Sequence, residues 1–113
     1  VVSGAFHSPL MGDAIPGLTS ALEKLGIQKS AIPVYTNVSA RPAENEADIR
    51  KLLNLQLLSP VLWEQTIQNM ITDGATQFYE VGAGKVLRGL LKRINSDVTA
   101  VGVGTAEEIA QLD

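Results

Sequence analysis

Strand-like and helix-like segments alternate along nearly the whole of this chain, and this alternation limits its possible folds more than any other feature. Residues rich in β-branched and aromatic side chains predict strands in the opening apolar run and over 32–38, 76–81 and 98–103. Apolar residues at helical spacing predict helices over about 13–25, from 48, from 60, over 86–94 and from 105. We therefore predict an α/β fold with a mostly parallel sheet, helices on both of its faces, and functional groups at the carboxyl ends of the strands.

Residues suited to helix ends lie at several of the predicted boundaries. Ser8 and Pro9 can open a helix after the first strand. Asp48 is the predicted cap of a later helix, which the Ser59-Pro60 pair ends, so that Pro60 begins the next one. Thr105-Ala-Glu-Glu108 has the spacing of a capping box and predicts a short final helix.

The composition is that of one globular domain, predicted to span residues 1–113, because 45% of the residues are apolar and 19% are charged. A net charge of −3 gives no basic field for nucleic acid. The absence of cysteine excludes a disulfide framework and a zinc–thiolate site, and one histidine cannot form a metal-binding cluster. No apolar run approaches the roughly 18 residues of a membrane span, so we expect a cytoplasmic protein.

His7 is the only histidine, and it lies where the opening apolar run gives way to the Ser8-Pro9 helix start. Histidine is the side chain best suited to accept and return a proton near neutral pH, although a lone histidine is more often structural. None of the serines lies in a Gly-x-Ser-x-Gly turn, so the chain contains no evident nucleophile that His7 could activate as a base. The chain also begins without methionine, inside a predicted strand, and we expect it to be part of a longer protein.

The turn Gly82-Ala83-Gly84-Lys85 admits two interpretations. Glycines before a helix can let backbone amides approach a phosphate, but the spacing of both common phosphate-binding motifs fails here, so a tight strand-to-helix turn is favoured. The following helix carries cations on one side, at Lys85, Arg88, Lys92 and Arg93. These form either a solvated face or a docking patch for an acidic protein.

Three segments carry a resemblance to a known family. They are Gly4-Ala5-Phe6-His7-Ser8-Pro9-Leu10-Met11, Gln56-Leu57-Leu58-Ser59-Pro60-Val61-Leu62-Trp63 and Tyr79-Glu80-Val81-Gly82-Ala83-Gly84-Lys85-Val86-Leu87. In this order they resemble the C-terminal part of malonyl-CoA:acyl-carrier-protein transacylases, and the resemblance covers essentially the whole chain. It implies part of an α/β-hydrolase-like large subdomain, with a small ferredoxin-like subdomain inserted just before this chain would begin.

The resemblance implies transfer of a malonyl group from malonyl-CoA to acyl carrier protein through a malonyl-serine intermediate, in fatty acid biosynthesis. His7 would be the general base, and the backbone carbonyl of Gln56 would orient its ring. The nucleophilic serine, the oxyanion-hole glutamine and the arginine for the malonyl carboxylate would belong to a missing N-terminal part, so the isolated chain is expected to be inactive. The reaction needs no metal or redox cofactor, and the phosphopantetheine arm belongs to the carrier protein.

Pro60 supplies a physical reason for the role that the resemblance gives to Gln56. In a continuing helix the carbonyl of Gln56 would accept a hydrogen bond from the N–H of residue 60, and proline has none. An unpaired buried acceptor costs about 1 to 3 kcal/mol, so presenting this carbonyl to an imidazole satisfies it.

Two further functional assignments follow from the resemblance. Phe6 before the histidine resembles the motif of malonyl-selective enzymes, since a bulky ring leaves less room for an α-methyl branch, although a plain core role is also open. Lys85, Arg88 and Lys92 would help to contact the acidic carrier protein. The alternative function is a non-catalytic α/β module in which His7 is structural and the Gly82–Lys85 turn binds a phosphate or a protein.

Overall fold

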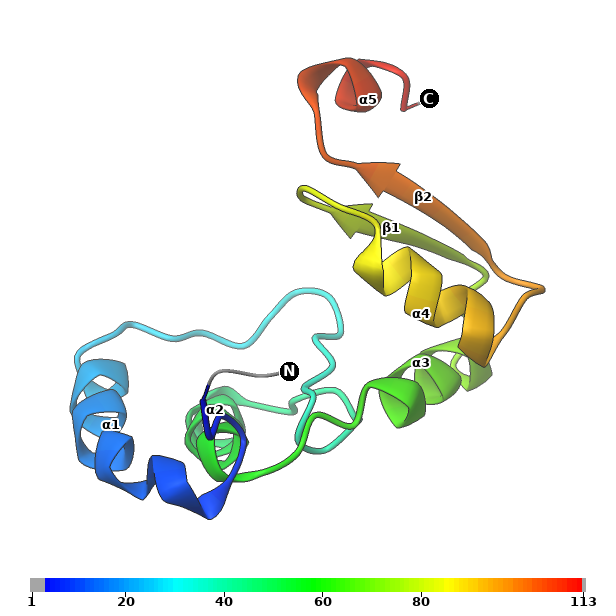
Figure 1. Cartoon of the computed structure of the whole chain (residues 1–113). Coiled ribbons are helices and arrows are strands. Elements are labelled where there is room, and N and C mark those ends of the chain that lie inside the picture. The colour runs from blue at the N-terminus through cyan, green and yellow to red at the C-terminus, as the bar shows by residue number, and fades with distance from the viewer. Residues whose placement is uncertain (1–3, 113) are drawn as a thin grey trace. The chain divides into compact units, whose positions relative to one another are not determined.

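The computed structural model describes residues 4–112, which include five α-helices, one 3₁₀ helix and two strands. The chain divides into two compact units, Val1–Thr66 and Ile67–Asp113, each of which is described by itself. Figure 1 shows the elements in chain order. No helix among the described residues is long and apolar enough to cross a membrane.

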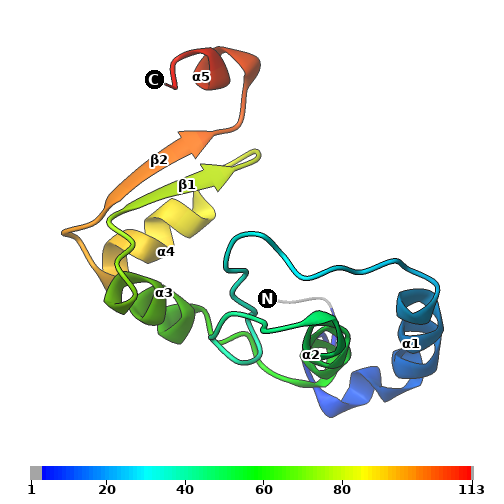
Figure 2. The ribbon, with the colours of Figure 1, turned by 180° about the vertical axis from the view of Figure 1, so that it is seen from behind.

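The first unit is built from η1 (Pro9–Ala14), α1 (Ile15–Glu23) and α2 (Glu46–Leu58), which contact one another. Ser8 caps η1, since its hydroxyl accepts from the N–H of Leu10, and the Asn45 side chain caps α2 by accepting from the N–H of Asp48. Arg50 of α2 donates to the carbonyls of Leu22 and Leu25 at the end of α1. The two helices are thereby tied together, and Figure 2 shows them from behind.

Several predictions for the first unit are wrong in detail. The predicted helix over 13–25 is divided, because the chain follows a 3₁₀ helix to Ala14 and becomes α-helical only at Ile15. The cap of α2 is Asn45 rather than Asp48. The opening strand does not continue into residues 4–6, and its first three residues lie outside the described part of the chain.

The predicted strand over 32–38 is also wrong, because Tyr35 forms only an isolated antiparallel bridge with Pro42. Ile32 is 73% exposed and Val34 is 48% exposed, so the apolar side chains of this segment have little to pack against. Strand propensity reflects packing against a neighbouring strand, and among the described residues no strand lies beside this segment.

Helix α3 (Trp63–Thr72) begins three residues later than predicted. The N–H of Leu62 donates to the carbonyl of Asn37 at 2.8 Å, and the carbonyl of Leu62 accepts from Thr66 at 2.9 Å. The first of these bonds holds Leu62 in a loop contact, so that the helix starts after it. Pro60 therefore lies in the connection between α2 and α3.

The second unit contains a β-α-β arrangement of β1 (Gln77–Val81), α4 (Val86–Ile94) and β2 (Thr99–Val103), followed by α5 (Ala106–Ala110). The strands pair in parallel, with Phe78 opposite Ala100 and Glu80 opposite Gly102. Leu91 of α4 and Val103 of β2 are buried. The α/β class and the parallel pairing are confirmed, although the described residues form a sheet of two strands rather than four.

The capping box at the start of α5 is confirmed. The Thr105 hydroxyl accepts from the N–H of Glu108 at 3.2 Å, and the Glu108 carboxylate accepts from the N–H of Thr105 at 3.1 Å. The same carboxylate also accepts from Gly104 at 2.6 Å. Three backbone N–H donors between the end of β2 and the first turn of α5 are thus satisfied locally.

Candidate functional site

His7 occupies the left-handed region of backbone conformation, with φ at 59°. This region is uncommon and strained for a residue other than glycine, so neighbouring bonds must hold it. Ser8 supplies them, because its hydroxyl donates to the carbonyl of Ala5 at 2.7 Å and its carbonyl accepts from Met11 at 3.0 Å. The bonds of Ser8 thus close a turn around His7 and lead directly into η1.

The His7 ring contacts the end of α2, which is 49 positions away in the sequence. Its Nδ1 lies 2.9 Å from the carbonyl oxygen of Gln56, and Pro60, four residues further on, has no N–H to compete for that oxygen. A carbonyl can only accept, so Nδ1 carries the proton in this contact, and in a neutral ring Nε2 is then the nitrogen with the lone pair. The structure thereby brings together the two residues assigned to catalysis, while their catalytic roles remain predictions.

Phe6 lies beside this site and is 62% exposed. Its ring covers Gly4, where an added Cβ would lie 2.8 Å from the ring carbon Cε2. Phe6 therefore packs against few of the described residues, and both its substrate-binding role and the alternative of a plain core role stay predictions.

The Gly82–Lys85 turn leads into α4, two of whose first amides are already occupied. The carboxylate of Glu80 accepts from the N–H of Leu87 at 2.8 Å and from the N–H of Arg88 at 3.2 Å. The Leu87 bond, opposed in part by burial and helped by Arg88, holds the pKa of Glu80 below its ordinary value. A half-buried anion at this helix start opposes the binding of a phosphate there.

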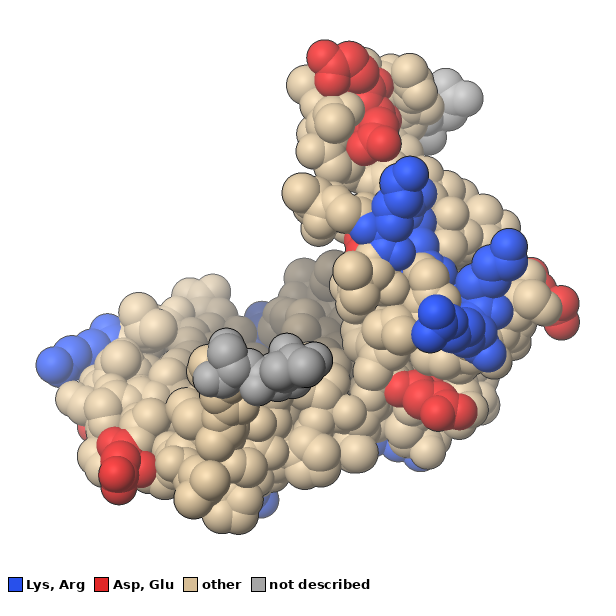
Figure 3. All heavy atoms as spheres, in the orientation of Figure 1, with Lys and Arg blue, Asp and Glu red and all other residues tan. Residues whose placement is uncertain are grey.

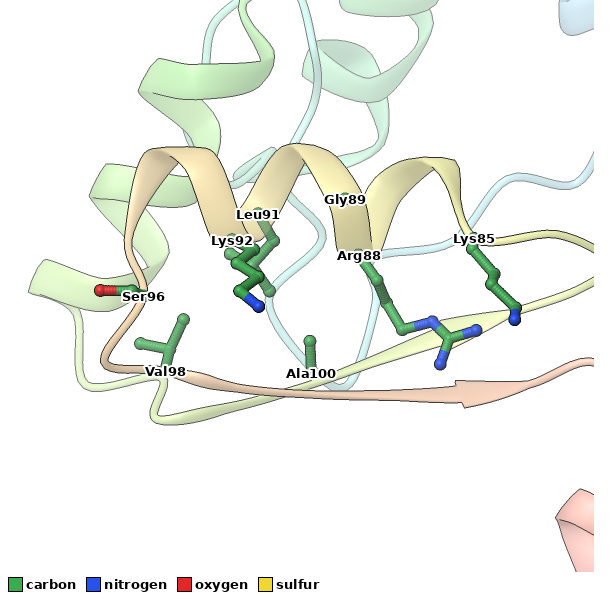
Figure 4. A pocket seen from close by; sticks show the side chains of 8 residues that line it. All are labelled: Lys85, Arg88, Gly89, Leu91, Lys92, Ser96, Val98 and Ala100. Carbon is green, nitrogen blue, oxygen red and sulfur yellow. The ribbon is translucent and has the colours of Figure 1, made fainter.

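An open groove of about 450 Å³ is lined by Lys85, just before α4, by Arg88 and Lys92 of α4, and by Ser96, Val98 and Ala100. Figure 4 shows the side chains of Lys85, Arg88 and Lys92 extending from α4 along the side that carries this groove. Figure 3 shows basic side chains gathered on this part of the second unit.

Arg88 differs from its two neighbours in that it is already paired. Its Nε lies 3.2 Å from the Glu80 carboxylate, and its guanidinium group covers Gly102, where any added Cβ would collide with it. Lys85 and Lys92 form no ion pair with the described residues. Of the three residues assigned to docking, the two lysines are the ones available to a partner.

Among residues 4–112, no group of three His, Asp or Glu side chains could hold a metal ion.

A scan against protein-family models gave no match. Individual proteins do match. The malonyl CoA-acyl carrier protein transacylase of Bacillus subtilis is 43% identical over 108 residues, which are 96% of this chain and 34% of the relative.

Solved structures agree with this similarity. An acyl-carrier-protein S-malonyltransferase from Bartonella henselae has a TM-score of 0.91 at 40% identity and covers 96% of this chain. The chain is homologous to the C-terminal part of malonyl-CoA:acyl-carrier-protein transacylases. A third match, with a TM-score of 0.90 at 35% identity over 99% of this chain, is a malonyl-transacylase in complex with its type II PKS acyl-carrier protein. The chain spans about a third of the length of these transacylases.

Sequence reasoning missed two residues of this transacylase homologue. Glu80 was not expected to cap α4, although a carboxylate just before a glycine turn and a helix is a usable signal. The side chain of Gln56 was also not considered, because only its backbone carbonyl was assigned. No sequence pattern indicates which groups the amide of that side chain contacts.

Proposed function

We propose that this chain acts as the C-terminal part of a malonyl-CoA:acyl-carrier-protein transacylase. It would work with an N-terminal part that supplies the nucleophilic serine, and residues 1–113 would belong to one large subdomain. The similarity over 96% of the chain supports this proposal. The single observation that carries the site is the 2.9 Å contact between His7 Nδ1 and the Gln56 carbonyl.

In the proposed reaction, His7 Nε2 takes the proton from the serine hydroxyl while the serine oxygen attacks the thioester carbon of malonyl-CoA. The carbon–sulfur bond then breaks, and the protonated ring returns the proton to the leaving thiol of coenzyme A. The thiol of the carrier protein's phosphopantetheine arm next attacks the ester carbon of malonyl-serine while His7 Nε2 takes the thiol proton. The bond between that carbon and the serine oxygen then breaks, and the protonated ring returns the proton to the serine oxygen. Throughout, the Gln56 carbonyl accepts from Nδ1–H and stabilises the protonated ring.

Acyl transfer of this kind is balanced without a metal ion or a redox cofactor, since each step exchanges one acyl group and one proton. The chain's partners in this proposal are malonyl-CoA, acyl carrier protein and the N-terminal part. Phe6 would lie beside the acyl group and favour malonyl. Lys85 and Lys92 would contact the carrier protein directly, and Arg88, which is paired with Glu80, would add its charge to the same surface. The cytoplasmic compartment stays a prediction from the sequence.

The test combines this chain with a transacylase N-terminal part that contains the serine, and measures malonyl transfer to acyl carrier protein. We expect transfer only with both parts present, and His7→Ala should lower it by about 10²- to 10⁴-fold, the usual contribution of general acid–base catalysis. Lys24→Ala, at an exposed position after α1, is the matched control. Full activity of the His7→Ala protein would exclude the proposed role.

The alternative of a phosphate-binding module is less well supported. Its site would need the first amides of α4, and two of these already donate to Glu80. A mixture that transfers no malonyl group but binds inorganic phosphate would favour this alternative.

A further inference from the structure

The side chain of Gln56 has contacts that the proposed mechanism does not use. Its amide Nε2 lies 3.0 Å from the carbonyl oxygen of Ser59 and 3.5 Å from that of Pro60. The same nitrogen is 3.4 Å from His7 Nδ1. One half-buried residue therefore contacts the His7 ring with its backbone and the connection after α2 with its side chain.

These contacts lie where α2 comes to its end. Ser59 is extended, with φ −116° and ψ 147°, so the chain leaves the helix there and its last carbonyls lack helical partners. A glutamine amide has two N–H donors, which is the number needed for the carbonyls of Ser59 and Pro60. The side chain thus ties the residues after the helix back to position 56, whose own carbonyl must point at His7.

The same contacts decide the tautomer of the ring. The carbonyl at 2.9 Å requires a proton on Nδ1, whereas the amide nitrogen at 3.4 Å would require a bare Nδ1 if it donated there. With its donors directed to Ser59 and Pro60, the amide does not compete for the ring. The Nδ1–H form is then the favoured one, and Nε2 is left as the base.

We propose that the Gln56 side chain is a positioning group, which holds its own backbone carbonyl on His7 and thereby selects the ring tautomer. The consequence for catalysis rests on the proposed function, but the effect on the tautomer does not. This role explains why a residue whose backbone touches the histidine also needs a side chain with two donors.

Because His7 is the only histidine, a long-range ¹H–¹⁵N spectrum of the labelled chain reports its tautomer without assignment. We expect the native chain to show the Nδ1–H form. Gln56→Met keeps the length and loses both donors, so it should lose the predominance of this form. Gln28→Met makes the same exchange at an exposed position and should leave the spectrum native.

Gln56→Asn is the second variant, since it keeps the amide but shortens its reach, and it should also lose the Nδ1–H form. A native tautomer in a folded Gln56→Met or Gln56→Asn chain would overturn the proposal. In the combined enzyme we expect Gln56→Met to lower kcat by about 10- to 100-fold with little change in KM, because a misplaced base affects the chemical step. If Gln56→Met changed the tautomer of His7 but left kcat undiminished, the catalytic role of His7 would be rejected, and the positioning role of the Gln56 side chain would be supported.

Discussion

At the scale of single residues, the His7 site depends on two residues that break the local rules of their segments. His7 holds a left-handed backbone, and Pro60 removes the N–H that would otherwise bond the Gln56 carbonyl. The left-handed backbone of His7 costs on the order of 1–3 kcal/mol. Hydrogen bonds of Ser8 close the turn around His7, and the Gln56 side chain bonds the connection that contains Pro60, so the geometry is built from side chains close to the ring.

Replacing Pro60 tests whether the missing N–H matters. In Pro60→Ala the new N–H can bond the Gln56 carbonyl, and the preceding Ser59 regains access to helical conformations. We expect α2 to lengthen and the Nδ1–H tautomer of His7 to lose its predominance, as read from the ¹⁵N spectrum. Pro33→Ala, in an exposed loop position, is the control. An unchanged spectrum would mean that the carbonyl stays on the ring for another reason.

Phe6 tests acyl selectivity at the same scale. Its ring is exposed beside His7, and its replacement by serine opens room for an α-methyl branch. We expect Phe6→Ser to reduce the preference for malonyl over methylmalonyl, measured as the ratio of the two kcat/KM values, by about 10-fold, since one methyl group is discriminated by about that factor. Phe6→Leu should change the ratio less. An unchanged ratio in Phe6→Ser would remove Phe6 from the specificity site.

At the scale of elements, Glu80 links β1 to α4. Its carboxylate bonds the first amides of the helix and pairs with Arg88, which in turn lies over Gly102 of β2. The Glu80 carboxylate thus joins β1 to α4 directly, and Arg88 extends this connection to β2. The close approach continues at Gly104, where an added Cβ would lie 2.7 Å from the carbonyl of Gly82.

The pKa of Glu80 predicts a pH dependence of stability. Because the folded value is lowered from 4.5, the stabilising effect is complete above about pH 4.5 and is lost as the pH falls through the folded value. We expect Glu80→Gln to unfold more readily than the native chain at about pH 6, with the difference shrinking in acid. Denaturant unfolding at several pH values measures this, with Glu23→Gln as control. A difference that does not depend on pH would show that the charge of Glu80 is not what stabilises α4.

The elements that sequence reasoning predicted well are those whose signals are local. Helix α5 is predicted by its capping residues Thr105 and Glu108, and α4 by the helical spacing over 86–94. Both signals act within a few residues, and the structure contains both helices. Residues 32–38 were misjudged because strand formation depends on a partner elsewhere in the chain. The contact of His7 with Gln56 spans 49 positions, so it could be expected only from the family resemblance.

At the scale of the whole molecule, charge is distributed unevenly. The chain has a net charge of −3, yet Lys85 just before α4 and Lys92 within it have no ion-pair partners among the described residues. A local basic patch on an acidic protein attracts an acidic partner at short range, and the attraction weakens with salt.

The proposed contact with the carrier protein can therefore be tested by reversing charge. In the combined enzyme, Lys85→Glu and Lys92→Glu should each raise the KM for acyl carrier protein several-fold, because a favourable contact becomes a repulsive one. The KM for malonyl-CoA should stay the same, and the effect should diminish at high salt, where surface charges are screened. Lys24→Glu changes the net charge equally but lies in the other unit, so it separates local contact from overall charge. If all three variants behaved alike, net charge rather than the α4 lysines would govern the encounter, and the acidic partner would have to bind elsewhere.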